Sequence, residues 1–198
     1  MCSSDLKMFN EKATSTDIVS ASLIARTGAD SSARAGGVFH VECFDKDGNL
    51  KWETSEHNLV VNEGLQYMNT EFFKGSSYTA ALYLGLVTGP GSGTTYAAAD
   101  TLASHAWTEF TNYSGARKLV TFGTASTADP SVISNSGTPS QFVISGGGGV
   151  VAGAFLCTVS SGTSGVLFSE SDFQSPGDRT VVAGDTLNVT YTFSLDAA

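Results

Sequence analysis

The chain has 198 residues, 22 of them glycine, and only 15% of its residues are charged. Its net charge of −9 excludes duplex nucleic acid as an expected partner, because phosphate binding needs clustered Lys and Arg. No apolar run approaches the roughly 20 residues of a membrane-spanning helix. The first residues also lack the apolar core of a secretory signal, so we expect no membrane partner.

The three cysteines are Cys2, Cys43 and Cys157. An odd number without close spacing argues against a disulfide framework. Cys43 and Cys157 lie in apolar stretches, where a reduced thiol behaves as a small hydrophobic group. The sequence therefore predicts two free, buried thiols in a protein made in a reducing cytosol.

Residues 1–37 are rich in Ser, Thr, Ala and Gly, and their four basic and four acidic residues cancel. Their only apolar cluster comprises Ile18, Val19, Leu23 and Ile24. So little apolar area cannot form a core alone. We expect an extended N-terminal arm over residues 1–37, either disordered or ordered against a neighbouring subunit, and a body over residues 38–198.

The body begins with an expected hairpin. Residues 38–44 and 50–54 have the β-branched and aromatic content of strands, and the Asp-Gly pair at 47–48 marks a tight turn. The acidic turn has a weak likeness to a calcium loop. Its glycine comes too soon after Asp45 for an EF-hand, so we expect no metal there.

The best helix follows this hairpin. Apolar residues recur at helical spacing from residue 65 to residue 73, Asn62 is the expected N-cap, and Lys74-Gly75 the stop. Residues 80–87 predict a buried strand, apolar on both faces. Residues 100–110 predict one or two helical turns capped by Asp100.

The second half of the chain alternates strands and turns. We expect strands at residues 117–124, 141–144, 150–159 and 165–169. The glycines at 146–149 favour a loop tip, because no Lys-Ser/Thr pair follows them as in a phosphate-binding loop.

The last strand has the clearest pattern of all. Five apolar residues, from Leu187 to Leu195, alternate without error with hydroxyl and amide residues. Successive side chains of a strand point to opposite faces, so Tyr191 and Phe193 should be buried while Thr190 and Thr192 face outward or pair across strands. Residues 180–182 predict a preceding strand that returns through the Gly184-Asp185 turn.

These elements predict an all-β fold with one or two short helices. The spacing of turns is typical of an antiparallel β-sandwich with jelly-roll or Greek-key connections. No internal repeat of solenoid length is present.

No residue pattern predicts catalysis, a cofactor or a metal centre. His57 and His105 with Asp100 and Glu109 match no ligand spacing of known metal sites, and His105 beside Trp107 is more typical of packing. The chain lacks the Gly-x-Ser-x-Gly, Cys-x-x-Cys and His-Glu-x-x-His motifs. We therefore expect a protein that is not an enzyme.

The middle of the chain is rich in aromatic residues, which are Tyr78, Tyr83, Tyr96, Trp107, Phe110 and Tyr113. Such residues form platforms in carbohydrate-binding modules, but more often they pack in cores and at sheet edges. Coplanar, exposed rings would favour a sugar-binding surface, and buried rings would remove its basis.

Three segments together resemble a group of tailed-bacteriophage virion structural proteins. They are residues 56–65 (EHNLVVNEGL), residues 100–109 (DTLASHAWTE) with Tyr113, Ser114 and Arg117 after them, and residues 184–192 (GDTLNVTYT). The likeness spans residues 38–195, excludes the arm, and carries no catalytic residue with it.

The resemblance implies a virion protein made in the host bacterial cytoplasm. Within that class, we expect a capsid decoration or cement protein that binds the major capsid protein and sister subunits, as a homotrimer. A tail-fibre or tail-tip component is the alternative, although such proteins more often carry repeats. A carbohydrate-binding module is the third possibility.

Overall fold

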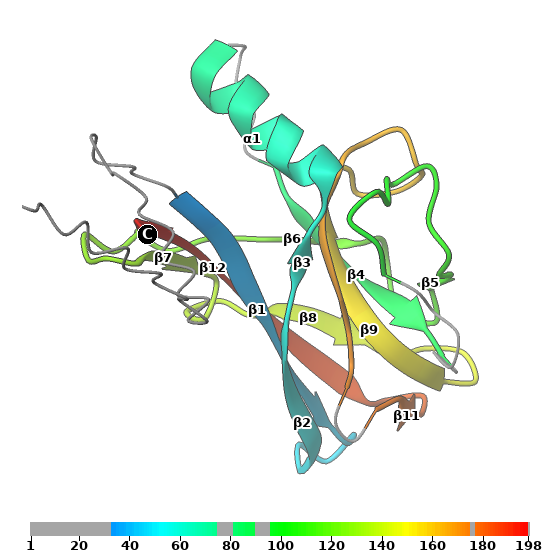
Figure 1. Cartoon of the computed structure of the whole chain (residues 1–198). Coiled ribbons are helices and arrows are strands. Elements are labelled where there is room, and N and C mark those ends of the chain that lie inside the picture. The colour runs from blue at the N-terminus through cyan, green and yellow to red at the C-terminus, as the bar shows by residue number, and fades with distance from the viewer. Residues whose placement is uncertain (1–32, 75–80, 90–95, 175–176, 198) are drawn as a thin grey trace, which may run out of the picture. The chain divides into compact units, whose positions relative to one another are not determined.

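The computed structural model describes residues 33–74, 81–89, 96–174 and 177–197 (Figure 1). Its described part is an all-β sandwich of two antiparallel sheets with one helix, which confirms the expected fold class. The jelly-roll and Greek-key alternatives remain predictions. Residues 1–32 of the expected arm lie outside the described residues. None of the described helices is both long and apolar enough to span a membrane.

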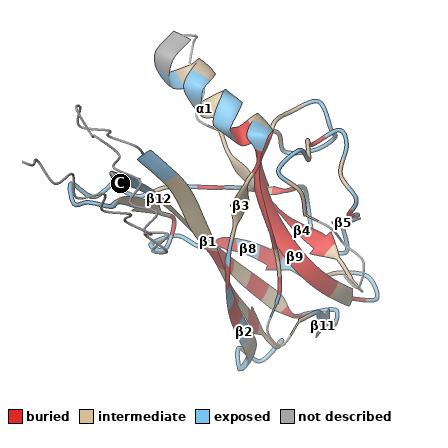
Figure 2. Cartoon of the chain, in the orientation of Figure 1, coloured by how far each residue is buried: buried red, intermediate tan, exposed pale blue. Residues whose placement is uncertain are grey.

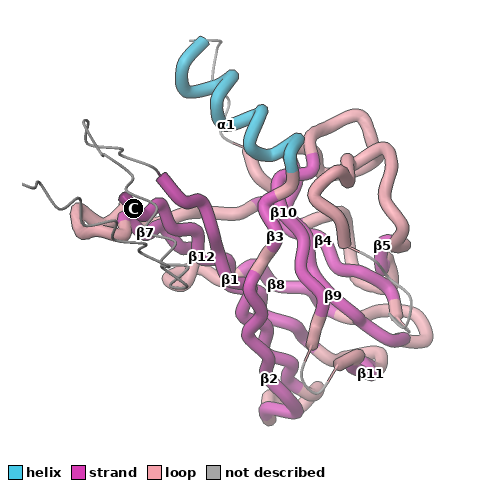
Figure 3. The backbone as a smooth tube through the Cα atoms, in the orientation of Figure 1, coloured by secondary structure: helices cyan, strands magenta, loops and turns pink. Residues whose placement is uncertain are grey.

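Sheet A contains five strands: β1 (Ala33–Phe44), β2 (Leu50–His57), β7 (Ser131–Ser134), β8 (Ser140–Val143) and β12 (Thr186–Ala197). Their order is β2-β1-β12-β7, and β8 also pairs with β12. Sheet B contains seven: β3 (Leu59–Val60), β4 (Tyr83–Thr88), β5 (Glu109–Phe110), β6 (Lys118–Leu119), β9 (Gly149–Cys157), β10 (Leu167–Asp172) and β11 (Arg179–Val181). Their order is β3-β10-β9-β4-β5, with β11 beside β9 and β6 beside β4. Figure 3 shows these strands joined by long loops.

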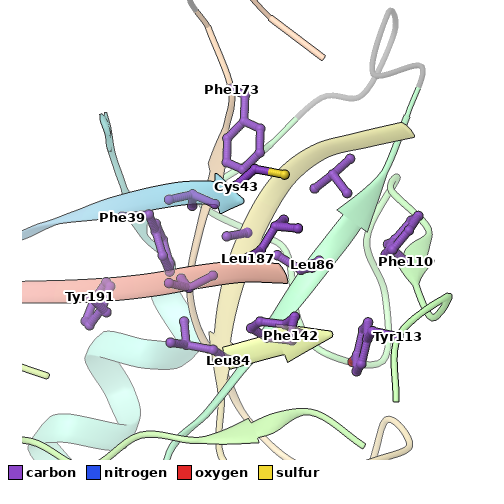
Figure 4. Close-up of a cluster of buried hydrophobic side chains, with 14 of the residues drawn as sticks. Phe39, Cys43, Leu84, Leu86, Phe110, Tyr113, Phe142, Phe173, Leu187 and Tyr191 are labelled. Carbon is purple, nitrogen blue, oxygen red and sulfur yellow. The ribbon is translucent and has the colours of Figure 1, made fainter. Parts of the chain in front are cut away.

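The main core lies between the two sheets. The buried side of β12 supplies Leu187, Val189 and Tyr191, as the alternation predicted, and Phe193 is half-buried against the same cluster. Side chains from β1 and β12 meet those of β4 and β9 (Figure 4), and the red stretches of Figure 2 follow this interface. Tyr191 packs against Phe39 with ring centroids 4.8 Å apart and the ring planes tilted by 48°.

The first strand is longer than expected. β1 begins at Ala33 and pairs with β12 along its whole length, from Ala33 opposite Ala197 to Phe44 opposite Thr186. The boundary between arm and body at residues 37 and 38 is therefore wrong. The small residues at 35–37 carry no apolar signal, and ladder hydrogen bonds with β12 hold them in the strand instead.

The β1–β2 hairpin is confirmed, and its turn chemistry is local. Gly48 has φ +83°, a conformation that favours glycine. The Asp45 carboxylate accepts the backbone N–H groups of Asp47 and Asn49, both at 2.9 Å. The Asn49 side-chain amide also donates to this carboxylate, at 3.0 Å, and it is the main cause of the lowered pKa of Asp45, with the backbone bonds adding to it. Asp45 therefore organises the turn.

The helix α1 (Asn62–Lys74) is also confirmed, but Asn62 is not its N-cap. Leu65 donates its N–H to the Val61 carbonyl, so Val61 precedes the first helical residue. The Asn62 N–H instead bonds the Ala98 carbonyl at 2.8 Å. A loop distant in sequence thus satisfies this end of the helix.

In the described structure one expected element is absent and another is shortened. Residues 100–110 form no helical turns, because the Leu102 N–H donates to the Glu63 carboxylate rather than to a carbonyl of its own segment. Residues 117–124 form only the short β6, because the chain then crosses between sheets. Val120 bonds Leu82 beside β4, and Gly123 bonds Ser134 of β7.

The end of the chain also crosses between sheets. The expected strand before Gly184 exists as β11, but it pairs with β9 in sheet B, while β12 belongs to sheet A. The turn is held by Asp185, which is 2% exposed, accepts the Val182 N–H and pairs with Lys51. The expected hairpin between these two strands is therefore wrong.

Candidate functional site

Residues 96–117, named here the loop layer, include β5 at the edge of sheet B, and the part around Leu102 and Trp107 covers the outer face of that sheet. Leu102 and Trp107 of this layer are buried in a second hydrophobic cluster with Phe155 and Cys157 of β9. The Trp107 and Phe155 rings lie 4.6 Å apart. The loop layer contains most of the residues that the sequence suggested for chemistry, and it is therefore the first candidate for a functional site.

The most unusual group beneath the loop layer is Glu170 of β10, which is 0% exposed. The Trp107 indole N–H donates to one carboxylate oxygen at 2.7 Å. The other oxygen, Oε1, has no hydrogen-bond partner among the described residues. A buried carboxylate with an unsatisfied oxygen is costly, so protonation is the favoured way to reduce the cost.

Two effects raise the pKa of Glu170 to about 7. Burial is the larger one, since it disfavours the charged form, and the nearby Asp100 carboxylate adds to it; the Trp107 bond acts in the opposite direction. The Tyr96 hydroxyl lies buried in the same region and has no hydrogen-bond partner within the described part of the chain, and burial raises its pKa as well. Glu170 thus changes its protonation state near neutral pH, and its bond to Trp107 joins the loop layer to sheet B.

Arg117 and Glu109 form a second polar lock. Two hydrogen bonds join the guanidinium to the carboxylate, at 2.8 Å from Nε and 2.7 Å from Nη2. The Arg117 side chain is 4% exposed and lies over the Phe155 ring, 5.1 Å from its centroid. Its remaining Nη1 donates to the Val159 carbonyl at 3.3 Å. These internal partners occupy Arg117, so it holds the loop layer in place.

Glu63 provides the third lock, from the first turn of α1. Its Oε2 accepts the N–H groups of Leu102 at 3.2 Å and Leu167 at 2.6 Å. The helix start is therefore bonded both to the loop layer and to β10. Glu63 is the acidic residue of the first helical turn, and only the structure connects it to these loops.

The suggested His and carboxylate set is not assembled. His105 stacks on Trp107, with centroids 3.6 Å apart and planes at 11°, and its Nδ1 lies 2.8 Å from the Trp107 carbonyl. His57 belongs to β2 in the other sheet. His105 therefore has the packing role that its neighbour Trp107 suggested.

The aromatic residues of the middle segment line cores. Trp107, Phe110 and Tyr113 are at most 6% exposed, and Tyr83 and Tyr96 are half-buried against the second cluster. Tyr78 lies outside the described residues. These rings form no exposed platform in the described part of the chain, so the carbohydrate-binding alternative loses its basis.

Another group of side chains lies on sheet A, and sequence reasoning missed it. Among the described residues, only His40, Glu42 and Glu53 bring three metal-ligating groups together, with one ligand atom from each within 4.8 Å of the others. His40 and Glu42 alternate with buried residues of β1, and Glu53 is the direct ladder partner of Glu42. The strand period and the hairpin register could have revealed this group.

Comparison of the chain with protein-family models, curated proteins and solved structures finds no match.

Proposed function

We propose that this chain is a non-enzymatic structural protein of a tailed-bacteriophage virion. In this proposal it decorates the outer capsid shell, contacts the major capsid protein and assembles with sister subunits as a homotrimer. It is made in the host bacterial cytoplasm and remains in the virion.

One observation carries the proposal: of the three segments that resemble virion proteins, the first is hydrogen-bonded to each of the other two. Glu63 of the first segment accepts the Leu102 N–H of the second at 3.2 Å. Asn58 of the first donates to the Tyr191 hydroxyl of the third at 2.8 Å. The resemblance therefore follows residues that join the helix, the loop layer and the two sheets, as expected of a shared framework.

The use of the polar side chains supports a structural role over a catalytic one. The buried carboxylates of Glu170 and Asp185 bind an indole and an ammonium group from other segments. Arg117 is bonded to Glu109 within the loop layer. Groups that an enzyme would present to a substrate are here committed to holding layers together.

Decoration is favoured over a tail-fibre role by the organisation of the chain. The body is a sandwich without sequence repeats, and residues 1–32 precede β1, the strand beside β12 at the centre of sheet A. Their apolar residues 18, 19, 23 and 24 provide a small anchor for a neighbouring protein.

The test is a deletion of residues 1–31, which leaves all of β1 in place. We expect the thermal midpoint of the body to move little, because no residue of the two sheets is lost, and its occupancy on purified capsids to fall. Occupancy equal to that of the full chain would refute the anchoring role of residues 1–31. Labelling of the virion tail instead of the shell would favour the tail-component alternative.

A further inference from the structure

We propose that His40, Glu42 and Glu53 form a Zn²⁺ site on the outer face of sheet A. One imidazole and two carboxylates are a donor set that zinc accepts at short range. Their ligand atoms already lie within 4.8 Å of one another, close enough for one ion to bind all three after small side-chain rotations.

The backbone positions this group without any loop. His40 and Glu42 are two residues apart on β1, so both point away from the core, while Phe39, Val41 and Cys43 between and beside them are fully buried. Glu53 stands opposite Glu42 in the β1–β2 ladder. Two paired strands anchored in the core thus hold the three ligands.

The facing charges of Glu42 and Glu53 also favour a cation. Like charges directly opposite each other on neighbouring strands are destabilising. None of the ion pairs among the described residues includes Glu42 or Glu53. A divalent ion between the two carboxylates would remove this repulsion.

The imidazole has a partner outside the ligand group. His40 Nδ1 lies 2.8 Å from Ser55 Oγ, and Ser55 is the ladder partner of His40 on β2. Histidines that bind metal usually use one ring nitrogen for the ion and give the other a hydrogen-bond partner, which fixes the tautomer. This contact leaves Nε2 for the ion.

The donor set selects the class of metal. Calcium and magnesium prefer ligands made only of oxygen, so an imidazole disfavours them. Three protein ligands leave the fourth tetrahedral position of zinc for water or for a donor from a neighbouring molecule. The inference is independent of the capsid proposal.

Calorimetry with ZnCl₂ and the metal-stripped full chain at pH 7 tests the site. We expect one zinc ion to bind per chain. In His40→Ala and in Glu53→Gln, we expect the affinity for zinc to fall by a factor of about ten or more. His57→Ala is the matched control, because His57 lies on β2 outside the group, and it should bind as the parent does. Mg²⁺ should give no saturable heat.

Absence of saturable zinc binding would overturn the proposal, as would unchanged affinity in His40→Ala. Binding lost in Cys2→Ser but kept in His40→Ala would place the ion on the N-terminal segment and overturn it equally. A Co²⁺ spectrum in the visible range gives a second readout, and it should disappear in Glu53→Gln while circular dichroism shows the variant folded.

Discussion

The Glu170→Gln substitution tests how the loop layer is attached to sheet B. Glutamine keeps the shape of the side chain and an oxygen that can accept the Trp107 N–H. In the parent, Trp107 Nε1 lies 2.7 Å from Glu170 Oε2. Its amide can donate a hydrogen bond to the nearby Asp100 carboxylate, which in the parent adds to burial in raising the pKa of Glu170. The substitution therefore removes the charge and little else.

The magnitude follows from the pKa of Glu170, which burial raises from 4.5 to about 7. The unfolded chain loses this proton above pH 4.5, whereas the folded chain holds it until about pH 7. Stability from this group is thus present in acid and falls as pH rises through this window. At about 1.4 kcal/mol per pKa unit, the unfolding free energy that is lost across this window is about 3 kcal/mol.

Urea denaturation of parent and variant from pH 4.5 to pH 8 measures this effect. We expect Glu170→Gln to gain about 3 kcal/mol of unfolding free energy relative to the parent across that range, with most of the gain complete by pH 7. Asp47→Asn changes an exposed carboxylate in the β1–β2 turn. Its plot of unfolding free energy against pH should run parallel to that of the parent. A parallel curve for Glu170→Gln as well would refute a neutral, buried Glu170.

Two further predictions concern packing and thiol chemistry. Gly64→Ala places a Cβ 2.2 Å from the Phe168 carbonyl oxygen, so we expect denaturation to show a loss of about 1–3 kcal/mol in unfolding free energy. In the control Gly137→Ala the new Cβ meets nothing within 4 Å, so the unfolding free energy should change little. Equal effects of the two substitutions would contradict the close approach at Gly64. Burial raises the pKa of both Cys43, to about 12, and Cys157, so alkylation followed by peptide mass spectrometry should label them only after denaturation. Labelling of either thiol in the folded protein, or a disulfide-linked peptide, would show the prediction to be wrong.

Local patterns in the sequence determined the elements whose signals are carried by neighbouring residues. The alternation from Leu187 to Leu195 predicted which face of β12 is buried, because a strand repeats every two residues. The Asp-Gly pair predicted the hairpin, since a glycine at residue 48 accepts the left-handed conformation. The thiols of Cys43 and Cys157 were likewise predicted to be free and buried, and the structure confirms both.

Only the tertiary structure decided how these elements combine. β11 pairs with β9 instead of β12, because the chain changes sheets at the turn held by Asp185. The loop layer has no regular periodicity, since its residues satisfy their hydrogen bonds with Glu63 and Glu170 from distant segments. Glu170 comes directly after the expected strand at residues 165–169, and its burial depends on a layer that no local pattern describes. Contacts between residues far apart in sequence set these features, and a single sequence read locally contains no record of them.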